Sequence, residues 1–217
     1  MSTEQFENLR WSSHDSTLGF NHESALEMIE GGSVLDLGCG DGMLLDSLKL
    51  RGNNAEGVDI SPEAIKKCKV KGHKVELFDF SDSKLPHADN SFDYVVMLDV
   101  LEHLYNPDSL LTEAKRVSRR FMVLSVPNFS SLPARFQVFL GKVPENNRRG
   151  KGHVFWFNWN ILNKMLHSRE LRIVASKYRT FWQNRFIVGN LMSLLMNIKP
   201  NIFALSIVVK ISKNDIK

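Results

Sequence analysis

The stretch VLDLGCGDGMLL, residues 34–45, places three glycines and two aspartates between two apolar runs. Gly38, Gly40 and Gly42 stand at alternate positions, after a predicted strand and before a predicted helix. One or two glycines suffice for a tight turn, so three indicate a backbone surface that a ligand approaches closely. Amides at the start of a helix favour negatively charged or carboxylate groups. The loop therefore predicts a small-molecule site made largely of main-chain atoms.

The spacing of these glycines distinguishes two kinds of site. A dinucleotide fingerprint needs G-x-G-x-x-G, whereas the spacing here is G-x-G-x-G. Asp36 stands two residues before the first glycine. A carboxylate there would sit poorly beside a pyrophosphate, but it suits a ligand with an amino group. The sequence thus argues against a nicotinamide cofactor.

Alternating strands and helices must position this loop. Strands are predicted at 33–37, 54–60, 74–80, 92–98 and 120–126, with helices starting near Gly42 and after Ser61-Pro62 and Asn106-Pro107. Proline is favoured at the first helical position. The apolar run 92–98 is typical of a central strand covered on both faces. This alternation predicts a parallel α/β sheet with right-handed crossovers, which binds ligands at the carboxyl ends of its strands.

The last third of the sequence has a different pattern. Residues 127–153 mix aromatic, proline and basic residues, and we expect them to leave the core as an excursion. A helix is predicted near 159–168, followed by a closing pair of strands at 171–178 and 201–212. The last strand alternates so that one face is uniformly apolar and the other is mixed. Residues 182–198 are predicted to cover the acceptor pocket or to meet a second subunit, as in a homodimer.

The composition is that of an ordinary soluble globular domain. The 217 residues include 28 Lys and Arg against 24 Asp and Glu, a net charge of +4 that does not identify a nucleic-acid binder. The start of the chain lacks the pattern of a signal peptide, and no run of about 18 apolar residues would span a bilayer. Cys39 and Cys68 fit a reducing compartment. We therefore expect a cytoplasmic protein with neither nucleic acid nor membrane as its partner.

Four motifs, taken in order, resemble those of the class I S-adenosylmethionine-dependent methyltransferases. VLDLGCGDG is similar to the first motif of that family, and Asp59 matches its ribose-binding acid. LFDF matches the adenine-binding stretch, where Asp79 would accept from the exocyclic amine and Phe80 would cover the ring. FDYVVMLDVLEHL is similar to the fourth strand and its loop, where Leu98 would flank the methionine part. The cofactor-binding residues implied by the resemblance are Asp36, Gly38, Gly40, Gly42, Asp59, Ile60, Asp79, Phe80 and Leu98.

The resemblance also implies an architecture. It is a Rossmann-like seven-stranded sheet of order 3-2-1-4-5-7-6, with strand 7 antiparallel and helices on both faces. Residues 1–217 are expected to form a single methyltransferase domain that binds S-adenosyl-L-methionine. Its expected parts are a cap segment (1–30), a cofactor-binding core (31–126), a substrate-side excursion (127–157) and C-terminal helices with the closing strand pair (158–217).

Two histidines are candidates for acid–base chemistry on the acceptor. A sulfonium is already an activated methyl donor, so the protein has to align the acceptor and exclude water. A general base helps when the acceptor is a hydroxyl or amine, and His103 and His153 are the candidates. Each has a simpler interpretation, as a hydrogen bond within its loop or an anchor of the excursion. Glu102 is expected to orient a neighbour, and the Cys and His spacing predicts no metal site.

The acceptor site is expected to have walls from outside the parallel core. The first thirty residues and the excursion 127–157 are predicted to form these walls, since the core exposes only the cofactor there. The residues expected nearest the acceptor are Trp11, His14, Phe129, Arg135 and His153.

The later sequence narrows the resemblance. SVPNFSSLPARFQVFLGKVP and HVFWFNWNILNKMLHSRELRIV look like the methionine biosynthesis protein W (MetW) type, which is associated with homoserine acylation. Two functions follow. The chain is either a methyltransferase acting on a small-molecule acceptor or on one of lipid or sugar type, or a cofactor-binding regulatory partner of a biosynthetic enzyme without methyl transfer of its own. The cofactor motifs do not discriminate, because a regulatory binder would keep them too.

Overall fold

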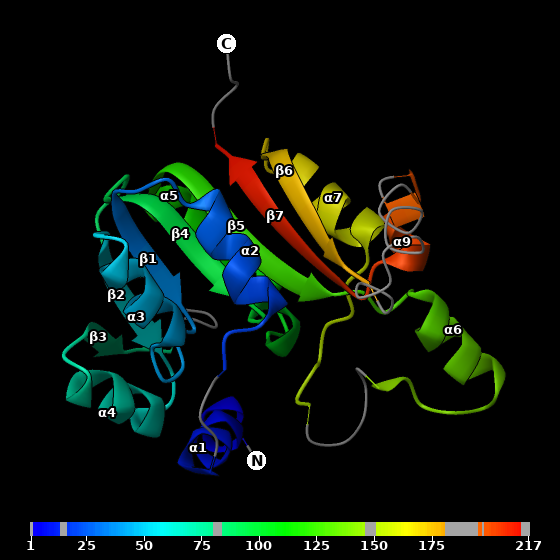
Figure 1. Ribbon diagram of the computed structural model, residues 1–217, viewed down its shortest axis with the longest axis horizontal. Coiled ribbons are helices and arrows are strands. Elements are labelled where there is room, and N and C mark those ends of the chain that lie inside the picture. The colour runs from blue at the N-terminus through cyan, green and yellow to red at the C-terminus, as the bar shows by residue number, and fades with distance from the viewer. Residues whose placement is uncertain are drawn as a thin grey trace.

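The core of the protein is one sheet of seven strands with helices on both sides (Figure 1). The computed structural model describes residues 2–13, 17–79, 84–145, 151–180, 195–196 and 198–213. The strands are β1 (Ser33–Leu37), β2 (Asn54–Asp59), β3 (Lys74–Leu77), β4 (Phe92–Leu98), β5 (Ser118–Pro127), β6 (Arg172–Arg179) and β7 (Ser206–Ser212). The helices are α1 (Thr3–Ser13), α2 (Phe20–Met28), α3 (Met43–Leu50), α4 (Pro62–Val70), the 3-10 turn η1 (Leu101–His103), α5 (Pro107–Val117), α6 (Leu132–Phe139), α7 (Trp159–His167) and α9 (Pro200–Phe203).

The strand order is β3-β2-β1-β4-β5-β7-β6, which confirms the predicted architecture. β1 pairs in parallel with both β2 and β4, and β4 pairs in parallel with β5. β7 is antiparallel to its neighbours β5 and β6, also as predicted. The carboxyl ends of β1, β2 and β4 therefore lie along one edge of the sheet.

Both faces of the sheet are buried, which explains the continuous apolar run in β4. Tyr94 and Val96 pack with buried residues of α2 and α3 on one face. Val95 and Met97 point the other way and pack with buried residues of α5 and α7. Because successive side chains of a strand alternate between faces, a strand covered on both sides has to be apolar at every position.

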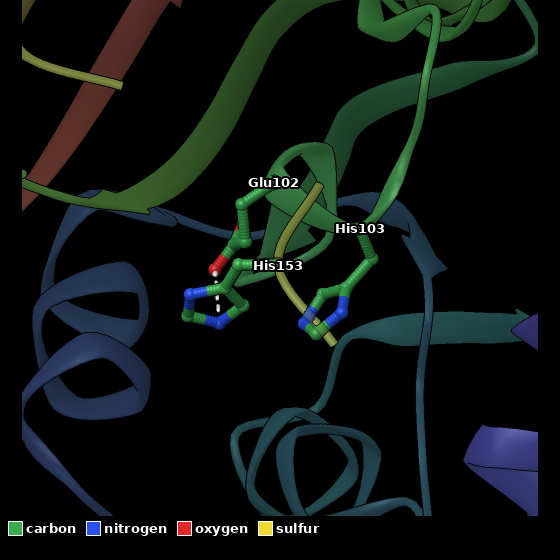
Figure 2. A group of neighbouring side chains, drawn as sticks. All are labelled: Glu102, His103 and His153. Carbon is green, nitrogen blue, oxygen red and sulfur yellow. Dashed lines mark ion pairs between the residues drawn. The ribbon is translucent and has the colours of Figure 1, made fainter. Parts of the chain in front are cut away.

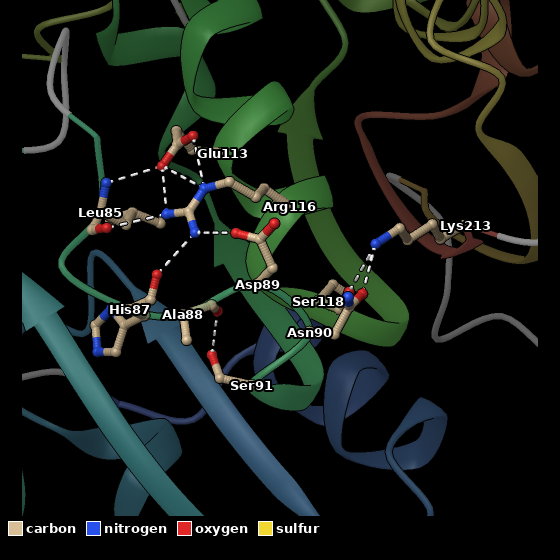
Figure 3. A network of polar contacts seen from close by, with 10 residues as sticks. All are labelled: Leu85, His87, Ala88, Asp89, Asn90, Ser91, Glu113, Arg116, Ser118 and Lys213. Atoms are coloured by element: carbon tan, nitrogen blue, oxygen red, sulfur yellow. Dashed lines mark hydrogen bonds and ion pairs between the residues drawn. The ribbon is translucent and has the colours of Figure 1, made fainter.

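A charged network fixes the segment that leads into β4, at the edge of the sheet opposite the glycine loop (Figure 3). The Arg116 guanidinium on α5 donates to the carboxylates of Glu113 and Asp89 and to the carbonyl oxygens of Leu85 and His87. The pKa of Arg116 is raised by these bonds, chiefly by the Glu113 carboxylate. The guanidinium group thus bonds at once to the segment 85–89 and to Glu113 of its own helix, which fixes the position of the chain just before β4.

The predicted final strand, 201–212, is wrong over its first residues. The segment Pro200–Phe203 is the short helix α9, and β7 starts only at Ser206. The side-chain amide of buried Asn128 holds this turn by donating to the carbonyl oxygens of Pro200, Asn201 and Ala204, at 3.1, 3.1 and 2.7 Å. Proline at the first helical position adds to this local preference.

The face of β7 that was expected to be mixed is buried like the other. All seven residues of the strand are buried, including Lys210. The Lys210 ammonium lies 4.3 Å from the centroid of the Phe121 ring and 2.9 Å from Glu30 Oε1. The long lysine side chain thus packs on an aromatic ring while its charge reaches an exposed carboxylate.

Other boundaries differ modestly from the predictions. The third strand ends at Leu77, before the predicted end at 80, and Phe78 N instead donates to Asp59 O. The helices α1, α2 and α6 lie in segments for which the sequence pattern predicted no regular structure. Residues 181–194, which hold most of the predicted pocket or subunit contact, lie outside the described part of the chain. Among the described residues, no helix has the length and apolar character needed to cross a bilayer.

Candidate functional site

The glycine loop joins β1 to α3 at the carboxyl edge of the sheet. The amides of Gly38 and Cys39 donate to Val58 O, at 2.7 and 3.1 Å. Gly38 and Gly40 have φ of 80° and 54°, in the left-handed region that favours glycine. A Cβ would lie 2.5 Å from a methyl of Val100 at Gly38 and 2.5 Å from the Trp11 ring at Gly40. The loop thus needs glycine both for its backbone conformation and for the close approach of its neighbours.

Asp59 closes β2 and holds the loop from the side. Its Oδ2 accepts from Gly40 N at 2.9 Å, and its Oδ1 accepts from Ser61 N at 2.8 Å. The side chain is only 5% exposed, and this burial raises the pKa of the carboxyl although the amide bonds oppose the shift. A carboxylate offers about four lone-pair positions, so acceptor capacity remains for a ligand beside the loop.

Asp36 is a second acid beneath the loop. It lies in β1, is 4% exposed, and has a pKa raised to about 7 by burial, with the Asp59 charge adding to the effect. A carboxyl of this kind is neutral at slightly acidic pH and gains its charge when a cation comes near. This behaviour is what a ligand with an ammonium group would exploit.

A cavity of about 150 Å³ opens above the loop. It is walled by the carboxyl ends of β1, β2 and β4 and by one side of α1. The residues predicted for the site that line it are Gly38, Gly40, Asp59, Ile60, Leu98 and His103. Ligand clefts typically enclose about 300–1,000 Å³, so the space under α1 is small for a ligand of that class.

Helix α1 covers this cavity. Trp11 is buried against Gly40, and Glu7, Arg10 and Trp11 all line the space. The helix is fastened to α4 by Asn8, whose Oδ1 accepts from Ser61 Oγ at 3.2 Å and from Glu63 N at 3.1 Å. In Figure 1 the helix lies beyond the carboxyl ends of the strands, apart from the layered core. The cover is therefore held by a few contacts, and the helix must shift for a larger ligand to enter.

A second group of side chains meets beside the cavity (Figure 2). The carbonyl oxygen of Glu102 accepts from Val154 N and Phe155 N, at 2.8 and 3.0 Å, which pins the chain near 153 to the turn after β4. His153 Nε2 consequently lies 3.9 Å from Glu102 Oε1. The rings of His103 and His153 are 4.9 Å apart, edge to face. Residues fifty positions apart in the sequence thus form one cluster.

Burial dominates the electrostatics of this cluster. Glu102 is 1% exposed, and burial raises its pKa well above the usual range, with the charges of Asp99 and Glu7 adding to the effect and Arg10 opposing it. Burial likewise lowers the pKa of His103 to about 4, aided by His153 and Arg10. His103 is therefore neutral at pH 7 and a weak base in this state of the protein.

The remaining predicted cofactor-binding residues do not line the cavity or lie outside the described residues. Asp36 and Gly42 are buried outside the cavity lining. Asp79 is exposed just after β3 and does not line the cavity, and Phe80 lies outside the described residues. Their binding roles stay predictions.

Some of the residues predicted to form the walls of the acceptor site lie near the cavity, and others do not. α1 and the segment around His153 do lie at the carboxyl edge, and the Phe129 ring is 5.9 Å from that of His153. Arg135 lies elsewhere, with its Nε donating to Ser130 O, in a hollow that it shares with Trp159. His14 lies outside the described residues.

The sequence analysis missed several residues at the cavity. Glu7, Arg10, His22 and Asp99 line it. Asp99 has φ of 55°, unusual outside glycine, and its carboxylate accepts from Asn21 Nδ2 and from Ser125 Oγ. An aspartate directly after a strand was the available signal. The residues of α1 and α2 carried none, since only tertiary packing brings them to this edge.

The chain is similar in sequence to members of a known protein family. The family of the methionine biosynthesis protein MetW matches residues 20–164, a span that leaves out α1. The bifunctional methionine biosynthesis protein MetXA/MetW of Rhodopirellula baltica is 35% identical over 126 residues, which cover 54% of this chain and 20% of that protein. The ubiquinone biosynthesis O-methyltransferase of Dechloromonas aromatica is 35% identical over 94 residues, covering 41% and 40%. The chain thus spans less than half the length of either relative.

Solved structures agree on the fold. The magnesium protoporphyrin IX methyltransferase of Synechocystis PCC 6803, with bound S-adenosylhomocysteine, superposes with a TM-score of 0.66 and 17% identity, covering 98% of this chain and 95% of that one. This likeness shows the class I methyltransferase fold. Since the family match spans more than half of the chain and includes both the glycine loop and the Glu102 cluster, the chain belongs to the methionine biosynthesis protein MetW family.

Proposed function

We propose that this protein is an S-adenosylmethionine-dependent methyltransferase that acts on a small-molecule acceptor. The observation that carries the proposal is the bond between the buried Asp59 carboxylate and the Gly40 amide, at the wall of a cavity on the carboxyl edge of the sheet. This arrangement joins the predicted ribose acid to the predicted cofactor loop in one rigid unit.

The residues present fit the cofactor. No side chain fits on the loop at Gly38 or Gly40, because a Cβ there would collide with Val100 or Trp11. The loop therefore presents main-chain atoms to a ligand. Asp59 retains lone pairs for ribose hydroxyls. Asp36 lies beneath the loop and outside the cavity lining, so its charge would act on an ammonium group through the loop rather than by direct contact. When bound, the cofactor supplies an activated methyl group. The role of the chain is then to bind it, orient the acceptor and exclude water.

The acceptor side is formed by α1 and by the turn that carries His103. The similarity to a ubiquinone biosynthesis O-methyltransferase supports a hydroxyl as the accepting group. His103 is the cavity-lining residue among the predicted bases, and its Nδ1 lies 3.2 Å from Gly152 O. This contact orients the ring, so that Nε2 is the atom left to meet an acceptor proton.

Turnover of the cofactor tests the proposal. The full-length protein is incubated with S-adenosylmethionine and a panel of phenolic, sugar and lipid-type acceptors, and S-adenosylhomocysteine is measured. We expect acceptor-dependent product, reduced at least tenfold in Asp59→Ala. Asp89→Asn is the control and should leave product formation unchanged, because Asp89 lies at the opposite edge of the sheet, where it pairs with Arg116. Normal cofactor binding by Asp59→Ala would contradict the assignment of the site.

A regulatory role is the second candidate. The MetXA/MetW relative joins this kind of chain to a second enzyme in one polypeptide, which supports a partner enzyme as the target. Under this alternative, the chain would bind the cofactor with ordinary affinity but form no product with any acceptor. It would instead change the rate of a partner acyltransferase when mixed with it, and this change would depend on the cofactor.

The cellular setting belongs to the same proposal. Cys39 and Cys68 are buried free thiols, and Cys68 Sγ donates to Gly40 O at 3.1 Å. Because a reduced Cys68 supports the loop, the site suits the reducing cytoplasm. Alkylation of intact and denatured protein from cell extract would report whether both thiols are reduced.

A further inference from the structure

The cluster of Glu102, His103 and His153 contains ligand-type side chains that the proposed cofactor contacts at the glycine loop do not use. One ligand-type atom from each residue lies within 4.8 Å of the other two. Two imidazoles and one carboxylate are a common protein ligand set for divalent transition metals. We infer that this cluster binds one divalent transition-metal ion at the acceptor side of the cavity. The sequence spacing had predicted no metal site, because the third ligand comes from a distant segment.

The hydrogen bonds of His103 leave the correct atom available. Its Nδ1 lies 3.2 Å from the carbonyl oxygen of Gly152, so Nδ1 carries the proton and donates. Nε2 is then an unprotonated lone pair. Metal-binding histidines usually donate their second N–H to a carbonyl or carboxylate in this way, which fixes the orientation of the ring.

Glu102 supplies the second, independent observation. The side chain is 1% exposed, and no donor among the described residues reaches its Oε2. A buried carboxylate oxygen without a partner is costly. In Figure 2 the other oxygen of this carboxylate, Oε1, faces the His153 ring. A cation bound between Glu102 and the two rings would therefore offset the cost of burying this carboxylate.

The main chain keeps the three ligands together. The two amide bonds from Val154 and Phe155 to Glu102 O fix the approach of the His153 segment to the turn after β4. Two ligand atoms that each lie about 2.0–2.2 Å from one tetrahedral ion are roughly 3.3–3.6 Å apart. The 3.9 Å between His153 Nε2 and Glu102 Oε1 therefore needs only a small approach of the two side chains.

Three protein ligands leave at least one coordination position open. Because His103 lines the cavity, that position faces the space under α1, and it would take an oxygen of an acceptor. This last step alone rests on the proposed methyl transfer. With the ion bound, His103 acts as its ligand and no longer as the base for the acceptor. The presence of the ion itself can be tested without cofactor or acceptor, so failure of either proposal would be seen separately.

Cobalt binding to the full-length, chelator-treated protein tests the site. We expect one Co²⁺ per chain, with visible ligand-field absorption, displaced by an equal amount of Zn²⁺. Glu102→Gln and His153→Asn should each weaken binding at least tenfold while leaving the far-UV circular dichroism unchanged. His167→Asn is the matched control, because that histidine is exposed at the end of α7, and it should bind as the wild type does.

Two results would overturn the inference. One is the absence of stoichiometric Co²⁺ or Zn²⁺ binding to a protein that is folded by circular dichroism. The other is equal binding by the wild type and by a His103→Asn, His153→Asn double variant, which would place the ion elsewhere. Thermal unfolding with and without Zn²⁺ gives a second readout, since an ion bound only by the folded state raises the midpoint.

Discussion

The floor and the cover of the cavity are built in different ways. The floor comprises residues 36–42 and 58–61, where main-chain amides of the loop donate to Val58 O and to the Asp59 carboxylate. The cover comprises α1 and the segment 152–155. α1 is held by side chains, chiefly Asn8 on α4 and Trp11 on Gly40, and the segment is held at Glu102 O.

The difference separates binding from access. The floor is continuous with the buried core, so its geometry is fixed before any ligand arrives. Helix α1 can detach without disturbing the sheet, since its anchors are few, whereas the segment 152–155 stays bound to Glu102 O. Binding strength should therefore depend mainly on the floor, and the rates of entry and exit mainly on the cover.

The floor should show the largest effect. Asp59→Ala removes the acceptor for Gly40 N and Ser61 N together with the predicted ribose contacts. Hydrogen bonds to a charged group contribute about 1.5–3 kcal/mol each, so cofactor affinity should fall at least tenfold and approach a hundredfold. Calorimetric titration measures this loss, and Asp89→Asn serves as the control. Affinity within twofold of the wild type would mean that the floor does not set binding.

The contact between floor and cover can be broken at Gly40. A Cβ there incurs the cost of a left-handed φ, about 1–2 kcal/mol, and meets the Trp11 ring at 2.5 Å. Gly40→Ala should thus lower the free energy of unfolding and also release α1, seen as faster hydrogen exchange over residues 3–13. Gly52 also has a positive φ, 78°, but open space surrounds the position of a Cβ there. Gly52→Ala should therefore lower the free energy of unfolding without changing hydrogen exchange in α1.

A double-mutant cycle separates the two effects at Gly40. In a Trp11→Ala background the steric contact is gone, and Gly40→Ala should add only the backbone cost, with no further change in the exchange of α1. If Gly40→Ala speeds exchange of α1 equally in both backgrounds, the two regions are not coupled through Trp11.

Asp36 predicts a pH dependence confined to the floor. Folding raises its pKa from the ordinary 3.8 to about 7, so the folded state holds a proton that the unfolded state has released. The associated stability is present at low pH and is lost as the pH rises through 7, by about 1.4 kcal/mol between pH 6 and 8. Urea unfolding at the two pH values should show this loss in the wild type and not in Asp36→Asn.

Cofactor binding should be linked to the same proton. An ammonium group near Asp36 favours its charged form, so binding should release a proton near pH 7 and strengthen as the pH rises toward 8. Calorimetry in buffers of different ionisation enthalpy measures the release. Proton uptake in place of release would exclude Asp36 as the partner of a cation.

The cover should give the smallest effect. Asn8→Ala removes two hydrogen bonds that hold α1 to α4, each worth about 1 kcal/mol. We expect faster hydrogen exchange in α1 and severalfold faster cofactor association and dissociation, with nearly unchanged affinity. Stopped-flow kinetics measures the rates, and Glu4→Gln at an exposed position of the same helix is the control. A large loss of affinity with unchanged rates would reverse the roles given to the two regions.

The floor was predictable from sequence because its chemistry is local. Its features can be recognised from a few neighbouring residues. They are glycines at positive φ, an acid at the end of a strand, and Ser61-Pro62 at the start of a helix. Ser61 Oγ does accept from Ala64 N at the start of α4. The strand order came from resemblance to a family, since parallel pairing itself leaves no local signal.

The cover was predictable as segments but not as contacts, for the opposite reason. Trp11 meets Gly40, and His153 meets Glu102, only after the chain has folded. Helix α1 has a polar sequence with no strong apolar stripe, so its periodicity did not mark it. The short helix α9 likewise depends on the side chain of Asn128, seventy residues earlier. Such contacts are tertiary, and hydrophobic periodicity does not report them.

The attachment of the His153 segment has an evolutionary consequence. The bonds that hold it run from the amides of Val154 and Phe155 to the carbonyl oxygen of Glu102, and all three are main-chain groups. Side chains at 102, 103 and 153 can therefore be exchanged while the segment stays in place. A lineage could gain, lose or alter the chemistry facing the acceptor by single codon changes, and a common scaffold could serve both catalysts and silent binders.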